Sequence, residues 1–108
     1  MSSPWIPIPV PNELAPGAIV RVLAGERRLA ALRHRGEWRV FDDACTHARC
    51  AFSKKGEVDT EQGILICNCH GAEFSLADGS VLLEPADVPL MFLPTRETTD
   101  GELEVQLD

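Results

Sequence analysis

Short segments in which apolar and polar residues alternate recur along the chain. The clearest is residues 102–107, where Leu103, Val105 and Leu107 alternate with polar side chains. A period of two is typical of a strand with one buried face, whereas no stretch shows the sustained period of a helix. The same reasoning predicts further strands over residues 18–23, 28–34, 38–41, 64–66, 74–76, 81–83 and 91–93.

Turn signals separate these segments, and prolines interrupt the first of them. The dipeptides Asp78-Gly79 and Asp100-Gly101 each follow an apolar stretch and favour tight turns. In residues 5–11 apolar side chains alternate with proline, which has no N–H to donate to a sheet, so this segment is predicted to be an edge strand or an extended arm. Many short strands at close spacing predict an all-β fold, either a small sandwich or a barrel.

The length of 108 residues predicts one domain covering the whole chain, residues 1–108. A unit of this size gains stability from a bound metal centre. The longest apolar runs are too short to span a bilayer, so we expect no membrane partner. The first residues contain neither a basic nor an apolar segment of the kind found in export signals, which predicts a cytoplasmic protein.

The net charge of −7 is unevenly placed, because all of the excess acid lies after residue 44. Phosphate binding needs clustered lysine and arginine, so the acidic chain argues against a nucleic-acid partner. Two interpretations of the acidity stay open: it favours docking to a basic patch on another protein, or it only keeps the chain in solution.

Two short motifs combine cysteine with histidine at the spacing of metal ligands. Cys45 and His47 form a C-x-H pair, and Cys67 and His70 form a C-x-x-H pair. The order Cys-His followed by Cys-His resembles the Rieske iron–sulfur proteins, and the resemblance continues through Gly71 to the proline at position 85. It implies a Rieske-type β-sandwich or barrel into which a subdomain of two cluster-binding loops, about residues 44–86, is inserted.

The resemblance also implies a cofactor and its ligands. It predicts one [2Fe–2S] cluster, with Cys45 and Cys67 on one iron and His47 and His70 on the other. Replacing two thiolates by neutral imidazoles makes the cluster less negative and easier to reduce. The alternative is a single zinc ion in a module without redox function, but zinc fingers place two cysteines before two histidines, and this chain does not.

Two further cysteines and three neighbours extend the comparison. The positions of Cys50 and Cys69 resemble those of a pair that forms a disulfide between the cluster loops in respiratory Rieske proteins, so we expect this bridge here; the alternative is two free thiols, which a reducing cytosol favours. Pro85 is expected in a loop that covers the cluster, with an ordinary turn as the alternative. Ala72 and Phe74 replace a serine and a tyrosine that donate hydrogen bonds to sulfur in high-potential members, so we expect a lower, ferredoxin-like potential.

The function implied by the resemblance is a soluble Rieske ferredoxin. Such a protein carries single electrons from a flavin-containing, NAD(P)H-dependent reductase to a terminal oxygenase. The sequence offers no evident acid–base pair or substrate pocket, so we do not expect an enzyme by itself. A second hypothesis is the Rieske small subunit of a larger oxidoreductase, such as a nitrite reductase or an arsenite oxidase.

Overall fold

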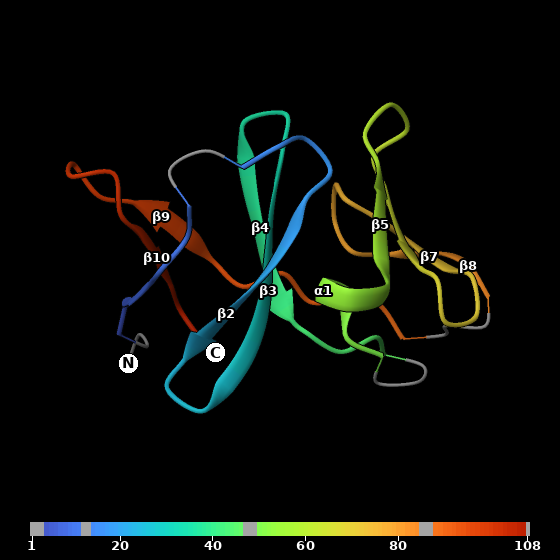
Figure 1. Ribbon diagram of the computed structural model, residues 1–108, viewed down its shortest axis with the longest axis horizontal. Helices are drawn as coiled ribbons and strands as arrows, with labels where there is room; N and C mark the ends of the chain where they lie inside the picture. Colours follow the sequence, from blue (N-terminus) through green and yellow to red (C-terminus); the bar gives the residue numbers. More distant parts are fainter. Residues whose placement is uncertain (1–3, 12–13, 47–49, 85–87, 108) are drawn as a thin grey trace.

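The computed structural model describes residues 4–11, 14–46, 50–84 and 88–107. Three antiparallel sheets make up the fold (Figure 1). The central sheet contains β2 (Ile19–Ala24), β3 (Arg27–His34) and β4 (Glu37–Asp42) in that order, and one of the other two sheets lies on each side of it. The prediction of an all-β fold is confirmed.

The middle strand of the central sheet, β3, is buried on both faces, which explains why its apolar residues are consecutive rather than alternating. Along β3, Leu29 and Ala31 pack into one hydrophobic cluster, while Ala30 and Leu32 pack into another on the opposite face. Successive side chains of a strand point to opposite faces, so four consecutive apolar residues are needed when each face meets a core.

The first outer sheet is formed by the two ends of the chain. Its order is β1 (Ile6–Ile8), β10 (Leu103–Val105) and β9 (Thr95–Glu97), all antiparallel. The strand β1 lies at the edge, where Pro7 is tolerated because no further strand requires its missing N–H. The edge-strand prediction for this segment is therefore confirmed, as is the amphipathic strand near the end of the chain.

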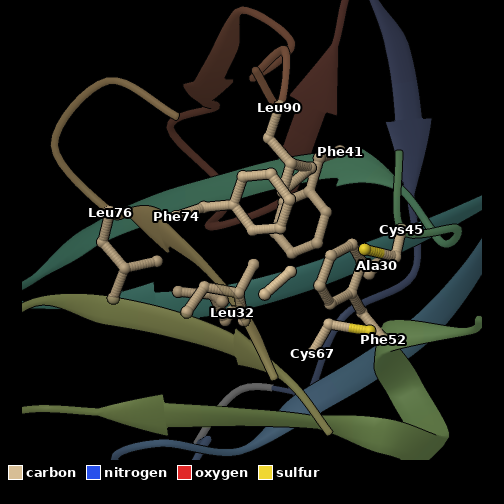
Figure 2. Packing of buried hydrophobic residues seen from close by; sticks show 11 residues of the cluster. Ala30, Leu32, Phe41, Cys45, Phe52, Cys67, Phe74, Leu76 and Leu90 are labelled. Atoms are coloured by element: carbon tan, nitrogen blue, oxygen red, sulfur yellow. The ribbon is translucent and has the colours of Figure 1, made fainter. Parts of the chain in front are cut away.

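The second outer sheet contains β5 (Gly56–Asp59), β6 (Ile64–Cys67), β7 (Ala72–Ser75) and β8 (Val81–Leu83) in sequence order, preceded by the short helix α1 (Phe52–Lys55). Its core is aromatic: the Phe52 ring meets Phe41 edge-on at 5.3 Å and Phe74 at 6.0 Å between ring centroids. Figure 2 shows these rings packed over the central sheet, with the sulfur atoms of Cys45 and Cys67 at one edge of the cluster.

Two details of the predicted strands are wrong. Residues 91–93 are not a strand; instead Leu93 is buried in one core and its N–H donates to the Val40 carbonyl at 2.8 Å, while Met91 is 80% exposed. The strand begins two residues later, at Thr95. The strand β5 and the helix α1 were not predicted, because their mostly polar residues carry no period that is visible in the sequence.

No helix in the part of the chain that the structure describes has the length and apolar character needed to cross a bilayer. The assignment of residues 1–108 to a single domain stays a prediction.

Candidate metal centre

The second predicted cluster loop is a tight turn between two paired strands. Cys67 is the last residue of β6 and is fully buried, whereas His70, three residues later in the turn, is exposed. The turn closes through a hydrogen bond from the Gly71 N–H to the Cys67 carbonyl at 2.8 Å. Gly71 has a φ of 84°, which favours glycine because a side chain is strained in this region. One turn therefore holds a buried thiol and an exposed imidazole.

The first predicted loop follows β4 and returns on itself before α1. Cys45 is 1% exposed, and its N–H donates to the Cys50 carbonyl at 2.8 Å, so the two ends of the loop are fixed to each other. Cys45 and Cys67 belong to the same buried cluster and neither is in a disulfide. His47 lies outside the described residues.

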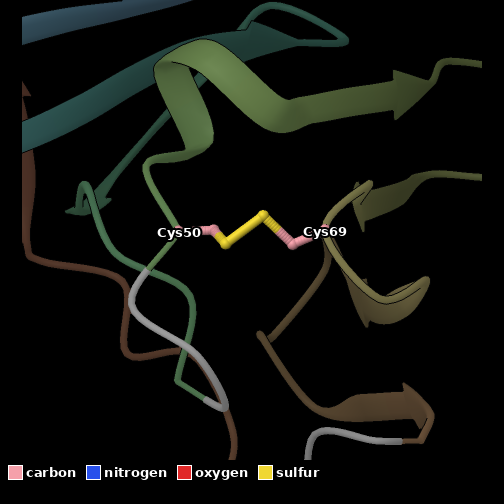
Figure 3. Close-up of a disulfide and its surroundings, with 2 residues drawn as sticks. All are labelled: Cys50 and Cys69. Carbon is pink, nitrogen blue, oxygen red and sulfur yellow. A yellow bond between two sulfur atoms is a disulfide. The ribbon is translucent and has the colours of Figure 1, made fainter.

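The two loops are joined covalently and by backbone. Cys50 and Cys69 form a disulfide, as the resemblance implied, and Figure 3 shows it bridging the two loops. The Asn68 N–H also donates to the Lys55 carbonyl at 2.8 Å, which ties the second loop to α1. Both disulfide cysteines are only half-buried, so the bridge is less protected than a fully buried one would be.

A buried carboxylate anchors the first loop at its start. Asp43 accepts hydrogen bonds from Arg21 Nε at 2.7 Å, from the Ser53 N–H at 2.8 Å and from Ser53 Oγ at 2.6 Å. Burial by itself raises the pKa of the Asp43 carboxyl, but the hydrogen bonds from Ser53 and Arg21 outweigh it and hold this pKa below its ordinary value. The sequence did not predict this network, because an acidic residue after a strand gives no sign of burial.

Two of the three predicted neighbours lie beside the buried cysteines. Ala72 pairs directly opposite Cys67 in the β6–β7 register, and both Ala72 and Phe74 are fully buried. Pro85 lies outside the described residues. The segment after it is near the first loop, because Thr46 Oγ1 donates to the Val88 carbonyl at 2.8 Å.

The donors in this region fit an iron–sulfur cluster. Two buried thiols suit iron that is shielded from water, and an exposed imidazole suits the outer edge of a mixed-ligand centre. The two loops that present them are held together before any metal is considered. In the part of the chain that the structure describes, buried thiols beside an exposed imidazole on a small all-β scaffold fit the class of iron–sulfur electron carriers.

Comparisons with known proteins agree with this class. A sequence profile of the Rieske [2Fe-2S] domain matches residues 4–96. Ferredoxin CarAc of Metapseudomonas resinovorans is 29% identical over 106 residues, covering 97% of this chain and 95% of that protein. The ferredoxin component of biphenyl 2,3-dioxygenase from Rhodococcus jostii is 33% identical, covering 73% of this chain and 71% of that protein.

A solved structure of a carbazole 1,9a-dioxygenase complex, described as reduced oxygenase with oxidized ferredoxin, contains a chain that matches with a TM-score of 0.79 and 28% identity, covering 94% of this chain and 92% of that chain. This chain therefore belongs to the Rieske [2Fe-2S] family, and its cofactor is one Rieske-type cluster. It is an electron-transfer component rather than a catalytic enzyme, and the zinc interpretation is not supported.

Proposed function

We propose that this chain is a soluble, cytoplasmic Rieske ferredoxin that accepts single electrons from a flavin-containing, NAD(P)H-dependent reductase and delivers them to a terminal oxygenase. The observation that most supports this function is that two loops joined by a disulfide bring the buried thiols of Cys45 and Cys67 together with the exposed imidazole of His70. A relative that matches nearly the whole chain is a ferredoxin, and relatives that match most of it are ferredoxin components of dioxygenases, which supports this assignment.

Within this function we propose that Cys45 and Cys67 hold the inner iron and that His47 and His70 hold the outer one. When bound, the cluster takes up and releases one electron. Burial of the two thiols keeps water and oxidants from the sulfur ligands, and exposure of His70 brings one ligand to the surface where a partner can approach. The disulfide and the Asp43 network keep the loops from moving when the charge of the centre changes.

The surface beside the turn is suited to brief contact with a partner. Leu82 and Leu83 on β8 and Val88 next to the first loop are each 50–52% exposed. Apolar residues around an exposed ligand bring a partner close without the strong ion pairs that would slow its release. We therefore propose that oxygenase and reductase meet the protein at this end, and that Pro85 covers the centre, which the Thr46–Val88 hydrogen bond supports.

One observation favours a second candidate function. The Cys50–Cys69 bridge is of the respiratory type, which suits the Rieske small subunit of an oxidoreductase such as arsenite oxidase or nitrite reductase. Co-purification with one large catalytic subunit at a fixed ratio would support that candidate. Purification as a separate chain would support the free carrier.

The test is reconstitution from separately purified components. A reductase and a terminal oxygenase encoded beside this chain should form product from NAD(P)H only when the chain is added. His70→Cys should lower the potential of the centre, because a thiolate replaces a neutral imidazole, while His34→Gln on the central sheet should leave it unchanged. Full turnover without the chain would contradict the proposed function, and an unaltered potential in His70→Cys would remove His70 from the ligands.

A further inference from the structure

Three of the four cysteines form a compact group of sulfur atoms. The Sγ atoms of Cys50, Cys67 and Cys69 all lie within 4.8 Å of one another. Two of them are bonded to each other in the disulfide, and Cys67 is not. A metal cannot use the bonded pair as thiolates, because only the deprotonated, reduced sulfur is a strong ligand. In the oxidised protein, Cys67 is thus the single thiol that this group offers.

Reduction of the bridge raises the number of free thiols in this group from one to three. Tetrahedral zinc with Zn–S bonds of about 2.3 Å needs its sulfur ligands about 3.8 Å apart. Three thiolates that start within 4.8 Å of one another reach this spacing by small side-chain rotations. The half-buried Cys50 and Cys69 leave the outer side of the group open to solvent, which can supply the fourth ligand.

The loops keep these cysteines near one another without the bridge. The Cys45 N–H to Cys50 carbonyl bond holds the first loop closed, and the Asn68 N–H to Lys55 carbonyl bond holds the second loop against α1. Neither bond involves a cysteine side chain, so both persist when the disulfide opens. Ligands that are already held in place bind a metal more tightly than ligands on free loops.

We propose that Cys50, Cys67 and Cys69 form a second metal site, for one soft ion such as Zn²⁺, which is closed by the disulfide and opened by its reduction. A dithiol reductant gives two electrons and two protons to the Cys50–Cys69 bond and becomes a disulfide itself. The ion then binds the three sulfurs and displaces their protons. This site and the iron–sulfur cluster share Cys67, so the two metals exclude each other. That conclusion rests on the ligand assignment proposed above.

The bridge therefore does more than hold the loops. While it is intact, it removes two thiols from a position where they would help a competing ion take Cys67 from the cluster. Zinc binds thiolate sites more tightly than ferrous iron does, so this competition favours the wrong metal unless the extra thiols are blocked. The disulfide reserves Cys67 for iron.

The experiment uses the purified, cluster-loaded full chain incubated with one equivalent of Zn²⁺, with and without a phosphine reductant. After desalting, zinc, iron and visible absorption are measured. The reduced wild type should retain close to one zinc per chain and lose iron at least fivefold faster than the unreduced protein. The matched control is Cys50→Ala/Cys69→Ala, which also lacks the bridge but has no additional thiols; it should retain less than a tenth as much zinc.

A second measurement does not depend on the double variant. In the reduced wild type, Zn²⁺ should protect Cys50, Cys67 and Cys69 together from alkylation, as read by peptide mass spectrometry. Equal zinc retention by the reduced wild type and the double variant, or protection of Cys67 without the other two, would overturn the three-sulfur site. Zinc retention with all iron kept would leave that site standing and would instead contradict the assignment of Cys67 to the cluster.

Discussion

Replacing Asp43 by asparagine should destabilise the protein far more than the same replacement at its neighbour Asp42. The Asp43 side chain is completely buried and accepts three hydrogen bonds from Arg21 and Ser53. Asparagine has nearly the same shape but carries no charge, and only one of its two terminal atoms accepts a hydrogen bond. In its better orientation, the amide oxygen keeps the Arg21 and Ser53 hydroxyl bonds, and the amide nitrogen then meets the Ser53 N–H.

The magnitude follows from these three bonds. Hydrogen bonds to a charged group contribute about 1.5–3 kcal/mol each and neutral ones about 0.5–1.5 kcal/mol, so two bonds weaken by about 1 kcal/mol each, and the loss of the third costs about 2 kcal/mol. The total is a loss of about 4 kcal/mol in the free energy of unfolding. Asp42 has a side chain that is 58% exposed and pairs with the half-buried Arg27, so its replacement should cost at most about 0.5 kcal/mol.

Thermal unfolding followed by circular dichroism and by visible absorption measures both variants. For a domain of about this length, 1 kcal/mol shifts the midpoint by roughly 4–8 °C, so Asp43→Asn should melt roughly 16–32 °C below wild type. Its visible absorption should also bleach faster, because Asp43 starts the loop that carries Cys45. If both variants melt within about 4 °C of wild type, the Asp43 network does not anchor the loop.

Three other predictions concern single positions. Gly79→Ala should lower the free energy of unfolding, measured by chemical denaturation, by more than about 3 kcal/mol, because a Cβ there would lie 2.1 Å from the Leu90 carbonyl oxygen. The control Gly101→Ala has a similar positive φ but nothing within 4 Å of its Cβ, so it should lose only about 1 kcal/mol. Equal losses in the two variants would refute the collision. Burial and two nearby arginines lower the pKa of His34 below its ordinary value of about 6.5. Its contribution to stability is therefore full above about pH 6.5 and is lost as the pH falls toward the folded pKa. His34→Gln should flatten this part of the plot of unfolding free energy against pH, and an unchanged slope would contradict the lowered pKa. Ala72→Ser should raise the reduction potential measured in a redox titration. If the new hydroxyl donates one hydrogen bond of about 1 kcal/mol to the reduced centre, the rise is about 40 mV. A fall in potential would refute that geometry.

The sequence predicts both a cytoplasmic location and a disulfide, and these two predictions disagree. A cytoplasmic protein is not expected to keep an accessible disulfide, because the surrounding thiol pool reduces it. The Cys50–Cys69 bridge links the two loops where both are partly exposed, so its redox state is set by the compartment as well as by the fold. The oxidation state of this pair in freshly lysed cells is therefore the measurement that connects the structure to its location.

Strands were predictable wherever one or both faces of a segment are regularly apolar. The alternation over residues 102–107 and the four-residue apolar run in β3 each reflect burial that local sequence records directly. The error at residues 91–93 arose because Leu90 and Leu93 enter two different cores from an irregular segment, which produces an apolar pattern without a strand. The short polar strand β5 is held by pairing with β6, and pairing is not visible in its own residues.

For the centre, the order of cysteine and histidine along the chain was enough to predict the family, which the comparisons confirm, and the ligands that we propose for the metal. The exposure of each side chain could be read only from the three-dimensional structure, because burial depends on segments that are distant in the chain. Tertiary packing buried Asp43 against Arg21 and Ser53, exposed His70, and brought Cys67 beside the Cys50–Cys69 bridge. The spacing of residues along the chain identifies candidate ligands, but the packing of separate loops determines which other side chains those ligands contact.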